Sequence, residues 1–302
     1  KFEDYLTKGP LAALDAIEKA TGEERVNAVG YCLGGTLLAC ALAHMAAKKD
    51  ERIASATFFA SMIDFSDPGE LGVFIDEDSI ESLETRMKER GYLAGNEMAQ
   101  TFNMLRANDL IWSFVVNNYL LGKEPIPFDL LYWNSDSTRM PASMHGFYLR
   151  KMYLQNDLVK PEGIVVAGVW LDLSKIKTPS YFLSTIEDHI SPWKSTYAGT
   201  RLFSGPVKFV LAGSGHIAGV INPPAANKYK HWTNGDALPE DPGEWLKHAK
   251  QHDGSWWPDW QKWIARRARE KVAARTPGKG KLKAIEDAPG SYVKLRLDSK
   301  SL

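Results

Sequence analysis

The chain has few of the features that mark several common protein classes. Its 302 residues include only two cysteines, Cys32 and Cys40, which are too few for a disulfide framework and whose spacing matches no metal-binding motif. No apolar stretch approaches the length of a membrane span, and no signal peptide is visible. We therefore expect a protein of the reducing cytoplasm that uses no metal ion and no cofactor.

A bias of charge is also missing. The 37 basic and 37 acidic residues cancel, so the molecule has no net field that would attract nucleic acid or an anionic membrane. Internal repeats and low-complexity tracts are absent, and the length suits one large α/β domain or two small ones. We expect neither nucleic acid nor a membrane among the partners.

The segment VNAVGYCLGG, which begins at Val26, is the most informative part of the chain. It sets Cys32 between an apolar run typical of a buried strand and an apolar helix over residues 36–47. Gly30 and Gly34 allow a tight, crowded turn at this point. The pattern predicts a nucleophile elbow with cysteine in place of serine. The alternative is a glycine-rich turn around an inert buried cysteine.

An elbow of this kind would activate the sulfur of Cys32. The helix that follows directs its free N–H groups and its positive end toward the sulfur, which favours a thiolate and any oxyanion formed beside it. The backbone N–H of Leu33 is the natural first donor to that oxyanion. Cys40 lies inside the apolar helix, and we expect it to be an inert core thiol.

Strands and helices alternate along much of the chain. Apolar runs predict further strands at residues 54–60, 180–184 and 207–212. Helical spacing predicts a helix over residues 2–20, broken at a proline, and another from Pro192 onward. This alternation indicates an α/β fold with a mostly parallel sheet, in which functional groups follow the carboxyl ends of the strands.

The sequence also favours a division into three parts. Residues 1–63 are interpreted as a partial α/β core with the elbow, residues 64–160 as a largely helical cap or lid insertion that covers the site, and residues 161–302 as the remaining core with C-terminal helices. The last part is rich in tryptophan, which we expect to pack among those helices. Residues 292–297 are a candidate strand.

Two ionisable residues follow the later predicted strands. Asp188 lies in EDHISPW, after the strand at 180–184, and His216 lies in GSGHIAG, after the strand at 207–212. The chain order cysteine, aspartate, histidine is that of nucleophile, acid and base in α/β-hydrolases. A free thiol is mostly protonated at neutral pH, so an imidazole must take its proton and a carboxylate can orient that imidazole.

Each of these residues also has a plainer explanation. Asp188 is suitably positioned to cap the next helix, and Asp64, which follows the strand at 54–60, is a rival acid. His216 is compatible with an ordinary surface loop. His189 is expected to support the site rather than to act in it. The other histidines are expected to be solvated or hydrogen-bonded: His44, His145, His231, His248 and His252.

Taken together, these segments resemble polyhydroxyalkanoate synthases, in particular the catalytic domain of the class I enzymes, which has the α/β-hydrolase fold. The resemblance rests on motifs spread over nearly the whole chain: GYCLGGTLLA, TFNMLRANDLIWSFVVNNYLLG, PIPFDLLYWNSDSTRMP, FYLRKMYLQNDL, EDHISPW, GSGHIAGVINPP and GSWWPDW.

The resemblance implies a role for each candidate residue. Cys32 would hold the growing acyl chain as a thioester, His216 would be its general base, and Asp188 would help to activate the 3-hydroxyl of the incoming monomer. The substrate would be an (R)-3-hydroxyacyl-coenzyme A such as 3-hydroxybutyryl-coenzyme A, and the products would be a polyester and free coenzyme A. The resemblance further implies a homodimer at the surface of polyhydroxyalkanoate granules, which the tail tryptophans could contact.

The resemblance leaves two points open. A complete α/β-hydrolase sheet has several strands before the elbow, whereas only about thirty residues precede Cys32. We therefore expect a fragment that contains the later half of the sheet, with one unpaired edge, and that is inactive or poorly folded by itself. The alternative functions are a cysteine thioesterase or acyltransferase of the same fold, and an inactive binding module associated with granules.

Overall fold

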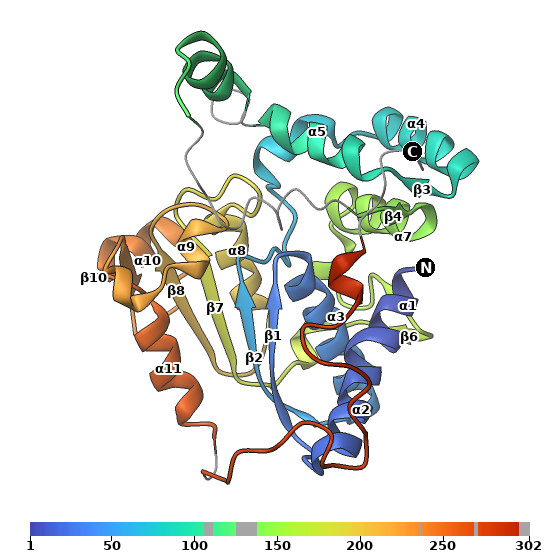
Figure 1. Ribbon diagram of the computed structural model, residues 1–302, viewed down its shortest axis with the longest axis vertical. Coiled ribbons are helices and arrows are strands. Elements are labelled where there is room, and N and C mark those ends of the chain that lie inside the picture. The colour runs from blue at the N-terminus through green and yellow to red at the C-terminus, as the bar shows by residue number, and fades with distance from the viewer. Residues whose placement is uncertain (106–110, 125–137, 236, 269–270, 296–302) are drawn as a thin grey trace. The chain divides into compact units, whose positions relative to one another are not determined.

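The computed structural model describes residues 1–105, 111–124, 138–235, 237–268 and 271–295, and the chain divides into two compact units (Figure 1). The first unit consists of Lys1–Asp76 and Tyr148–Lys283, and the second of Glu77–Phe147 and Ala284–Leu302. All the predicted site residues belong to the first unit. The predicted insertion, residues 64–160, contains Glu77–Phe147 together with residues of the first unit, and the three-part division stays a prediction.

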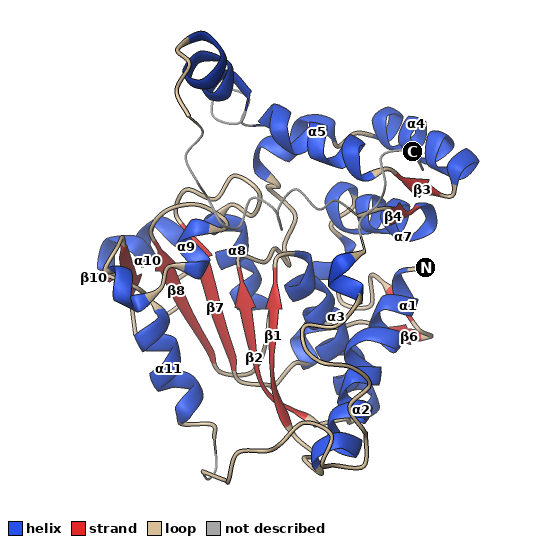
Figure 2. Cartoon of the chain, in the orientation of Figure 1, coloured by secondary structure: helices blue, strands red, loops and turns tan. Residues whose placement is uncertain are grey.

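A six-stranded sheet runs through the first unit, in the order β1-β2-β7-β8-β9-β10 (Figure 2). The first four strands in this order are parallel, whereas β9 and β10 join antiparallel. Their bounds are β1 Val26–Tyr31, β2 Ile53–Phe59, β7 Ser180–Thr185, β8 Val207–Ala212, β9 Lys230–Thr233 and β10 Lys250–Asp253. The predicted α/β fold with a mostly parallel sheet is confirmed. The sequence did not indicate β9 and β10, whose polar segments KHWT and KQHD lack a strand-like apolar run.

The first unit also contains helices that flank the sheet. They are α1 Phe2–Leu6, η1 Thr7–Leu11, α2 Ala12–Thr21, α3 Leu33–Lys48, α8 Trp193–Gly199, α9 Ala218–Ile221, α10 Pro242–His248 and α11 Trp257–Ala265. Short helical turns and a two-stranded hairpin complete it: η2 Gly69–Phe74, η5 Leu149–Leu154, η6 Asp157–Val159, η7 Leu173–Lys175, η8 Thr200–Leu202, η9 Pro224–Ala226, β5 Val165–Val166 and β6 Val169–Trp170. As predicted, the first helix is interrupted around Pro10, and α2 stops at Gly22, which has a φ of 78°.

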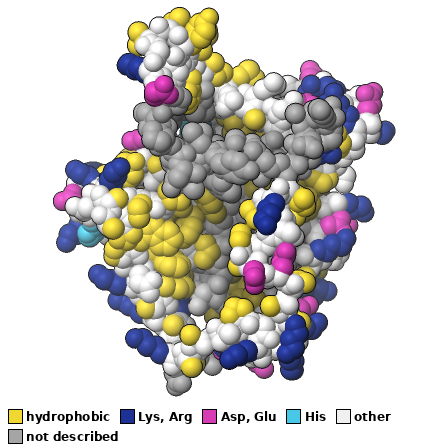
Figure 3. Space-filling view, viewed as in Figure 1, with side chains coloured by type: hydrophobic (Ala, Val, Ile, Leu, Met, Phe, Trp, Pro, Cys, Tyr) yellow, Lys and Arg dark blue, Asp and Glu magenta, His cyan; other side chains and the backbone are white. Residues whose placement is uncertain are grey.

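The central strands bury side chains on both faces of the sheet, as parallel strands do. On one face Phe58 of β2 stacks on Phe182 of β7, with ring centroids 4.4 Å apart. On the other face Phe59 and Tyr181 pack in one cluster with Trp256, which immediately precedes α11. Hydrophobic side chains gather over the sheet and α11 in the view of Figure 3. Two apolar layers therefore hold the strands whose ends carry the site.

The second unit is mostly helical. Its elements are α4 Glu77–Arg90, β3 Tyr92–Leu93, α5 Gly95–Leu105, η4 Val115–Leu120, β4 Met140–Pro141, α7 Ala142–Tyr148, whose last residue belongs to the first unit, and η10 Tyr292–Lys294. The strand predicted at residues 292–297 is wrong where the structure describes it, because the backbone of Tyr292–Lys294 forms a helical turn with the N–H of Leu295 bonded to Tyr292. Residues 125–137, most of the PIPFDLLYWNSDSTRMP motif, lie outside the described residues. Among the described helices, none is long and apolar enough to cross a membrane.

Two glycines allow β1 and α3 to meet at a sharp angle. A Cβ atom on Gly30 would lie 2.6 Å from the Cα of Gly35, and one on Gly35 would lie 2.0 Å from the Oγ of Ser61. A Cβ on Gly34 would meet no atom within 4 Å. The crowding expected at Gly30 is therefore present, and its partners are Gly35 and the carbonyl oxygen of Gly34. The second crowded glycine is Gly35 rather than Gly34, because Gly35 faces Ser61 in the chain that leaves β2.

We expect Gly35→Ala to destabilise the fold by about 1–3 kcal/mol, since the added methyl group must displace the buried Ser61. Gly34→Ala is the matched control, and we expect it to be neutral or to stabilise by about 0.5–1 kcal/mol, because it adds a methyl group in open space on a helix. Urea unfolding of both variants measures the difference. Equal losses of stability would contradict this account of the turn.

Candidate active site

Cys32 occupies the turn between β1 and α3. Its backbone has φ 54° and ψ −126°, a conformation that residues with a side chain rarely adopt. The N–H of Cys32 donates to the carbonyl oxygen of Phe59 at 2.9 Å, and the carbonyl of Cys32 accepts from Gly35 at 2.9 Å. These bonds hold the strained turn in place, and the side chain remains partly exposed. The turn thus has the geometry of the predicted elbow.

Asp188 and His216 are joined by a short hydrogen bond. The Nδ1 atom of His216 lies 2.7 Å from the Oδ2 atom of Asp188. The two residues follow β7 and β8, which are paired parallel neighbours, so the sheet brings their loops together. Both side chains are nearly buried. The structure therefore unites the acid and the imidazole that the sequence predicts.

The other carboxylate oxygen of Asp188, Oδ1, closes the turn that follows Asp188 in the chain. Oδ1 accepts the backbone N–H groups of Ile190 at 2.9 Å and Ser191 at 2.8 Å. The hydroxyl of Thr185 lies 3.3 Å from Oδ2. The helix-cap alternative is wrong, because α8 begins after Pro192 without a side-chain cap. The turn instead holds the carboxylate at a fixed angle to the ring.

His216 also lies close enough to the Cys32 thiol for the two groups to affect each other's charge. Burial by itself disfavours the charged ring, but the hydrogen bonds with Asp188 and Cys32 and the charges of these groups outweigh it and raise the pKa of His216 to about 10. Because Nδ1 faces Asp188, Nε2 is the nitrogen left for the sulfur. The Cys32 thiol therefore lies beside the imidazole that Asp188 holds.

The rival acid and the second cysteine lie in different environments. Asp64 accepts hydrogen bonds of 2.9 Å from the side chain of Asn156 and from the N–H of Ser66, and so closes a turn after β2. Cys40 is fully buried in α3, and burial raises the pKa of its thiol to about 12. This environment agrees with the expectation of an inert core thiol.

The N–H of Leu33 opens α3 directly after Cys32. The first N–H groups of a helix have no acceptor within the helix. Gly35 and Thr36 instead bond back to the carbonyl of Cys32, at 2.9 Å and 3.4 Å. The N–H of Leu33, which follows Cys32 directly, stays the predicted first donor to an anion beside the sulfur.

Sequence reasoning assigned no chemical role to the aromatic residues around the site. The hydroxyl of Tyr31 donates to the carbonyl of His216 at 2.8 Å, and the two rings stack with centroids 5.3 Å apart. Phe65, Tyr148 and Tyr153 pack against one another, and the charge of Cys32 adds to burial in raising the pKa of both tyrosines. The position of Tyr31 inside the elbow motif was the available signal for its role.

The remaining histidines serve different purposes. His231 bonds to the carbonyl of Gly254 at 3.1 Å and His252 to the hydroxyl of Thr233 at 2.8 Å, as expected for satisfied side chains. His44 and His145 depart from the expectation, because their buried Nδ1 atoms have no partner among the described residues. The structure leaves His189 partly buried beside Asp188, and its supporting role stays a prediction.

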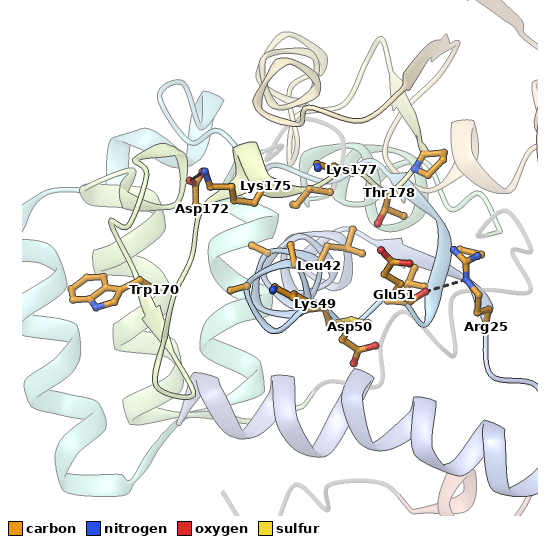
Figure 4. A pocket seen from close by; sticks show the side chains of 18 of the residues that line it. Arg25, Leu42, Lys49, Asp50, Glu51, Trp170, Asp172, Lys175, Lys177 and Thr178 are labelled. Carbon is orange, nitrogen blue, oxygen red and sulfur yellow. Dashed lines mark hydrogen bonds and ion pairs between the residues drawn. The ribbon is translucent and has the colours of Figure 1, made fainter.

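Two cavities of the first unit lie elsewhere. One, of about 660 Å³, is formed at the C-terminal end of α3 and at the amino ends of β1, β2 and β7, where Arg25, Lys49, Glu51 and Lys177 surround it (Figure 4). Another, of about 1000 Å³, lies at the amino ends of β7 and β8. The candidate site is at the carboxyl ends of these strands, so neither cavity belongs to it. Among the described residues, no group of three or more histidine, cysteine, aspartate or glutamate side chains could hold a metal ion.

Comparisons with known proteins extend this description. A family model described as alpha/beta hydrolase fold matches residues 11–223, which include Cys32, Asp188 and His216. The chain belongs to the α/β-hydrolase fold family. Among solved structures, the meta-cleavage product hydrolase of Pseudomonas fluorescens is 15% identical and covers 72% of this chain and 66% of that one, with a TM-score of 0.35.

Curated relatives match almost the entire chain. It is 56% identical to the poly(3-hydroxyalkanoate) polymerase subunit PhaC of Rhizobium meliloti (strain 1021), over 98% of this chain and 48% of that protein. It is 53% identical to the poly(3-hydroxyalkanoate) polymerase of Methylorubrum extorquens, over 98% of this chain and 49% of that protein. It is 46% identical to the poly(3-hydroxyalkanoate) polymerase subunit PhaC of Cupriavidus necator, over 98% of this chain and 51% of that protein. The predicted resemblance is confirmed, and the chain spans about half the length of these relatives.

The raised pKa of His216 predicts a pH-dependent stability. The pKa of His216 is about 10 in the folded state, above the ordinary value of about 6.5 that we expect in the unfolded chain. Protonation of His216 therefore stabilises the folded state fully below pH about 6.5. This contribution to the free energy of unfolding is lost as the pH rises through about 10. The gap in unfolding free energy between the unmodified protein and His216→Gln should therefore shrink from pH 6.5 to 10.

Urea unfolding at several pH values measures this gap. The control is His248→Gln, because His248 is exposed on α10 and distant in sequence from the site. We expect its gap to stay small and flat. A gap for His216→Gln that grows with pH would contradict the assignment of the charged ring.

Proposed function

We propose that this chain is the part of a poly(3-hydroxyalkanoate) polymerase that carries the reacting groups, with Cys32 as nucleophile, His216 as base and Asp188 as its partner. One observation supports it above the others: the Asp188–His216 hydrogen bond of 2.7 Å next to a cysteine at a strained elbow, in a chain similar to named polymerases over nearly its whole length. The substrate is an (R)-3-hydroxyacyl-coenzyme A, and the enzyme is an acyltransferase.

The first step loads the enzyme. Proton transfer from Cys32 to His216 gives a thiolate and a charged ring, which is the pair that the raised pKa of His216 favours, and the thiolate attacks the thioester carbonyl of the substrate. The oxyanion that forms is stabilised by the Leu33 N–H and by the positive end of α3. The carbon–sulfur bond to coenzyme A then breaks, and protonated His216 returns its proton to the departing thiolate. The acyl group now forms a thioester with Cys32.

The second step extends the chain. The 3-hydroxyl of another hydroxyacyl-coenzyme A attacks the thioester of Cys32, forms an ester bond and releases the Cys32 thiolate. His216 is the group that takes the hydroxyl proton, because both oxygens of Asp188 are already engaged, Oδ2 with His216 and Oδ1 with two backbone N–H groups. Asp188 therefore acts through the ring by orienting it and by stabilising its charge. The lengthened chain, still attached to coenzyme A, returns to Cys32 as in the first step.

A cysteine suits this cycle better than a serine would. Exchange between two thioesters changes the free energy little, so the enzyme-bound acyl group keeps its reactivity toward the next hydroxyl. Water must be excluded, because hydrolysis would end the chain. The cluster of Phe65, Tyr148 and Tyr153 near Cys32 supplies apolar surface for this purpose. We further propose a homodimer at the granule surface as the working form.

The first test supplies (R)-3-hydroxybutyryl-coenzyme A to the protein as its gene encodes it, and measures both free thiol and insoluble polyester. We expect both products. Free thiol without polyester would favour a thioesterase, and neither product, together with a Cys32 that resists iodoacetamide, would favour a binding module.

The second test replaces the proposed nucleophile. We expect Cys32→Ala to lower the rates of thiol release and polymer formation by a factor of about 10³ or more, because no other group can carry the acyl chain. Cys40→Ala is the matched control, since it removes the other thiol, which is fully buried in α3, and should largely spare both rates. Polymer formation by Cys32→Ala would refute the proposal.

A further inference from the structure

Three aromatic donors hold the backbone at His216 and just after it. The hydroxyl of Tyr31 donates to the carbonyl of His216 at 2.8 Å, across 185 residues of sequence. The indole N–H groups of Trp256 and Trp257 donate to the carbonyls of Gly219 and Val220, at 2.9 Å and 3.1 Å. All three acceptors lie in the loop after β8 or in α9.

This loop has little structure of its own to fix His216. Helix α9 contains only four residues, and Ser214 has a φ of 71°, which is unusual for a residue with a side chain. Gly219 presses against β7, because a Cβ there would lie 2.5 Å from the Cγ2 of Thr185. The position of the loop therefore depends on groups outside it.

The two tryptophans form a rigid support. Their rings stack with centroids 4.2 Å apart, and the ring of Phe59 meets both edge-on, at 5.0 Å and 5.7 Å. Trp256 is fully buried. Trp260, one helical turn farther along, donates to the hydroxyl of Thr57 at 3.1 Å. The support thus connects α9 to β2, the strand whose Phe59 carbonyl also accepts the N–H of Cys32.

We propose that Tyr31, Trp256 and Trp257 are positioning residues that hold the His216 imidazole in place beside the Cys32 sulfur. The consequence for polymerisation rests on the proposed function, whereas the effect on the thiol does not. Tyr31 contributes twice, through its hydrogen bond and through the stacking of its ring on the imidazole. A base displaced by about 1 Å can slow a reaction about a hundredfold, so supports of this kind matter.

The experiment measures the alkylation of Cys32 by iodoacetamide as a function of pH, in a Cys40→Ala background that leaves a single thiol. Thiolate is the reacting form, so the profile reports how well His216 takes the proton. In Tyr31→Phe, Trp256→Phe and Trp257→Phe, each of which removes one donor and keeps an aromatic ring, we expect the profile to move to higher pH. The rate near neutral pH should fall about tenfold or more in Trp256→Phe.

Trp245→Phe is the matched control. Trp245 is as fully buried as Trp256 but packs on Tyr197 and Phe209, in the layer on the other face of the sheet. We expect it to lose stability without a shift of the alkylation profile. A shift equal to that of Trp256→Phe would show a general structural effect and overturn the proposal, as would unchanged profiles in both Tyr31→Phe and Trp256→Phe.

Polymer assays of the same variants separate this inference from the proposed function. If the unmodified protein makes no polyester while the profiles shift as expected, the polymerase assignment fails and the positioning role stands. If the unmodified protein polymerises and the profiles stay unchanged, the reverse holds. In the polymerising case we expect kcat to fall in Tyr31→Phe with little change in KM, because the base and not the substrate contact is affected.

Discussion

The hydrogen bond between Asp188 and His216 is the interaction on which the site depends. It joins the loops that follow two adjacent parallel strands, so it requires β7 and β8 to be paired in the register that sets Thr185 opposite Ala212. A buried carboxylate is costly unless its oxygens are satisfied. Here two backbone N–H groups satisfy Oδ1, and the imidazole satisfies Oδ2, so the negative charge is stabilised at the place where the ring gains a proton.

The turn at Cys32 is the second feature on which the site depends. Cys32 keeps a strained backbone because the pairing of β1 with β2, the bond to Phe59 and the start of α3 leave it no other conformation. Gly30 and Gly35 let the strand and helix approach within a distance that any side chain would prevent. The strain is local, and the surrounding apolar core compensates for it.

The tryptophan-rich segment connects the loop of His216 to the turn of Cys32. Trp256 and Trp257 contact the chain after His216, and their neighbour Phe59 lies at the end of the strand that also supports Cys32. This is a more specific form of the packing expected for the tail. The proposed nucleophile and base are thereby attached to one aromatic cluster, although they lie far apart in the sequence.

The sequence alone was sufficient for the features that arise from short-range order. Apolar runs predicted β1, β2, β7 and β8 nearly to the residue, and the chain order of cysteine, aspartate and histidine indicated which strand ends to compare. It missed β9 and β10, because their polar segments become strands only by pairing with neighbours, and it named Gly34 where Gly35 is the crowded residue.

The pattern of residues by itself left Asp64 as a rival to Asp188, since both follow a strand, and the tertiary structure shows which side chain each carboxylate meets: His216 for Asp188, and Asn156 for Asp64. The same holds for Tyr31 and the tryptophans, whose acceptors are far away along the chain. Periodicity records which side of an element is apolar, whereas a hydrogen bond between distant segments depends on how those elements pack. The sequence therefore predicted a type of chemistry, and the fold decided how the residues that would perform it are arranged.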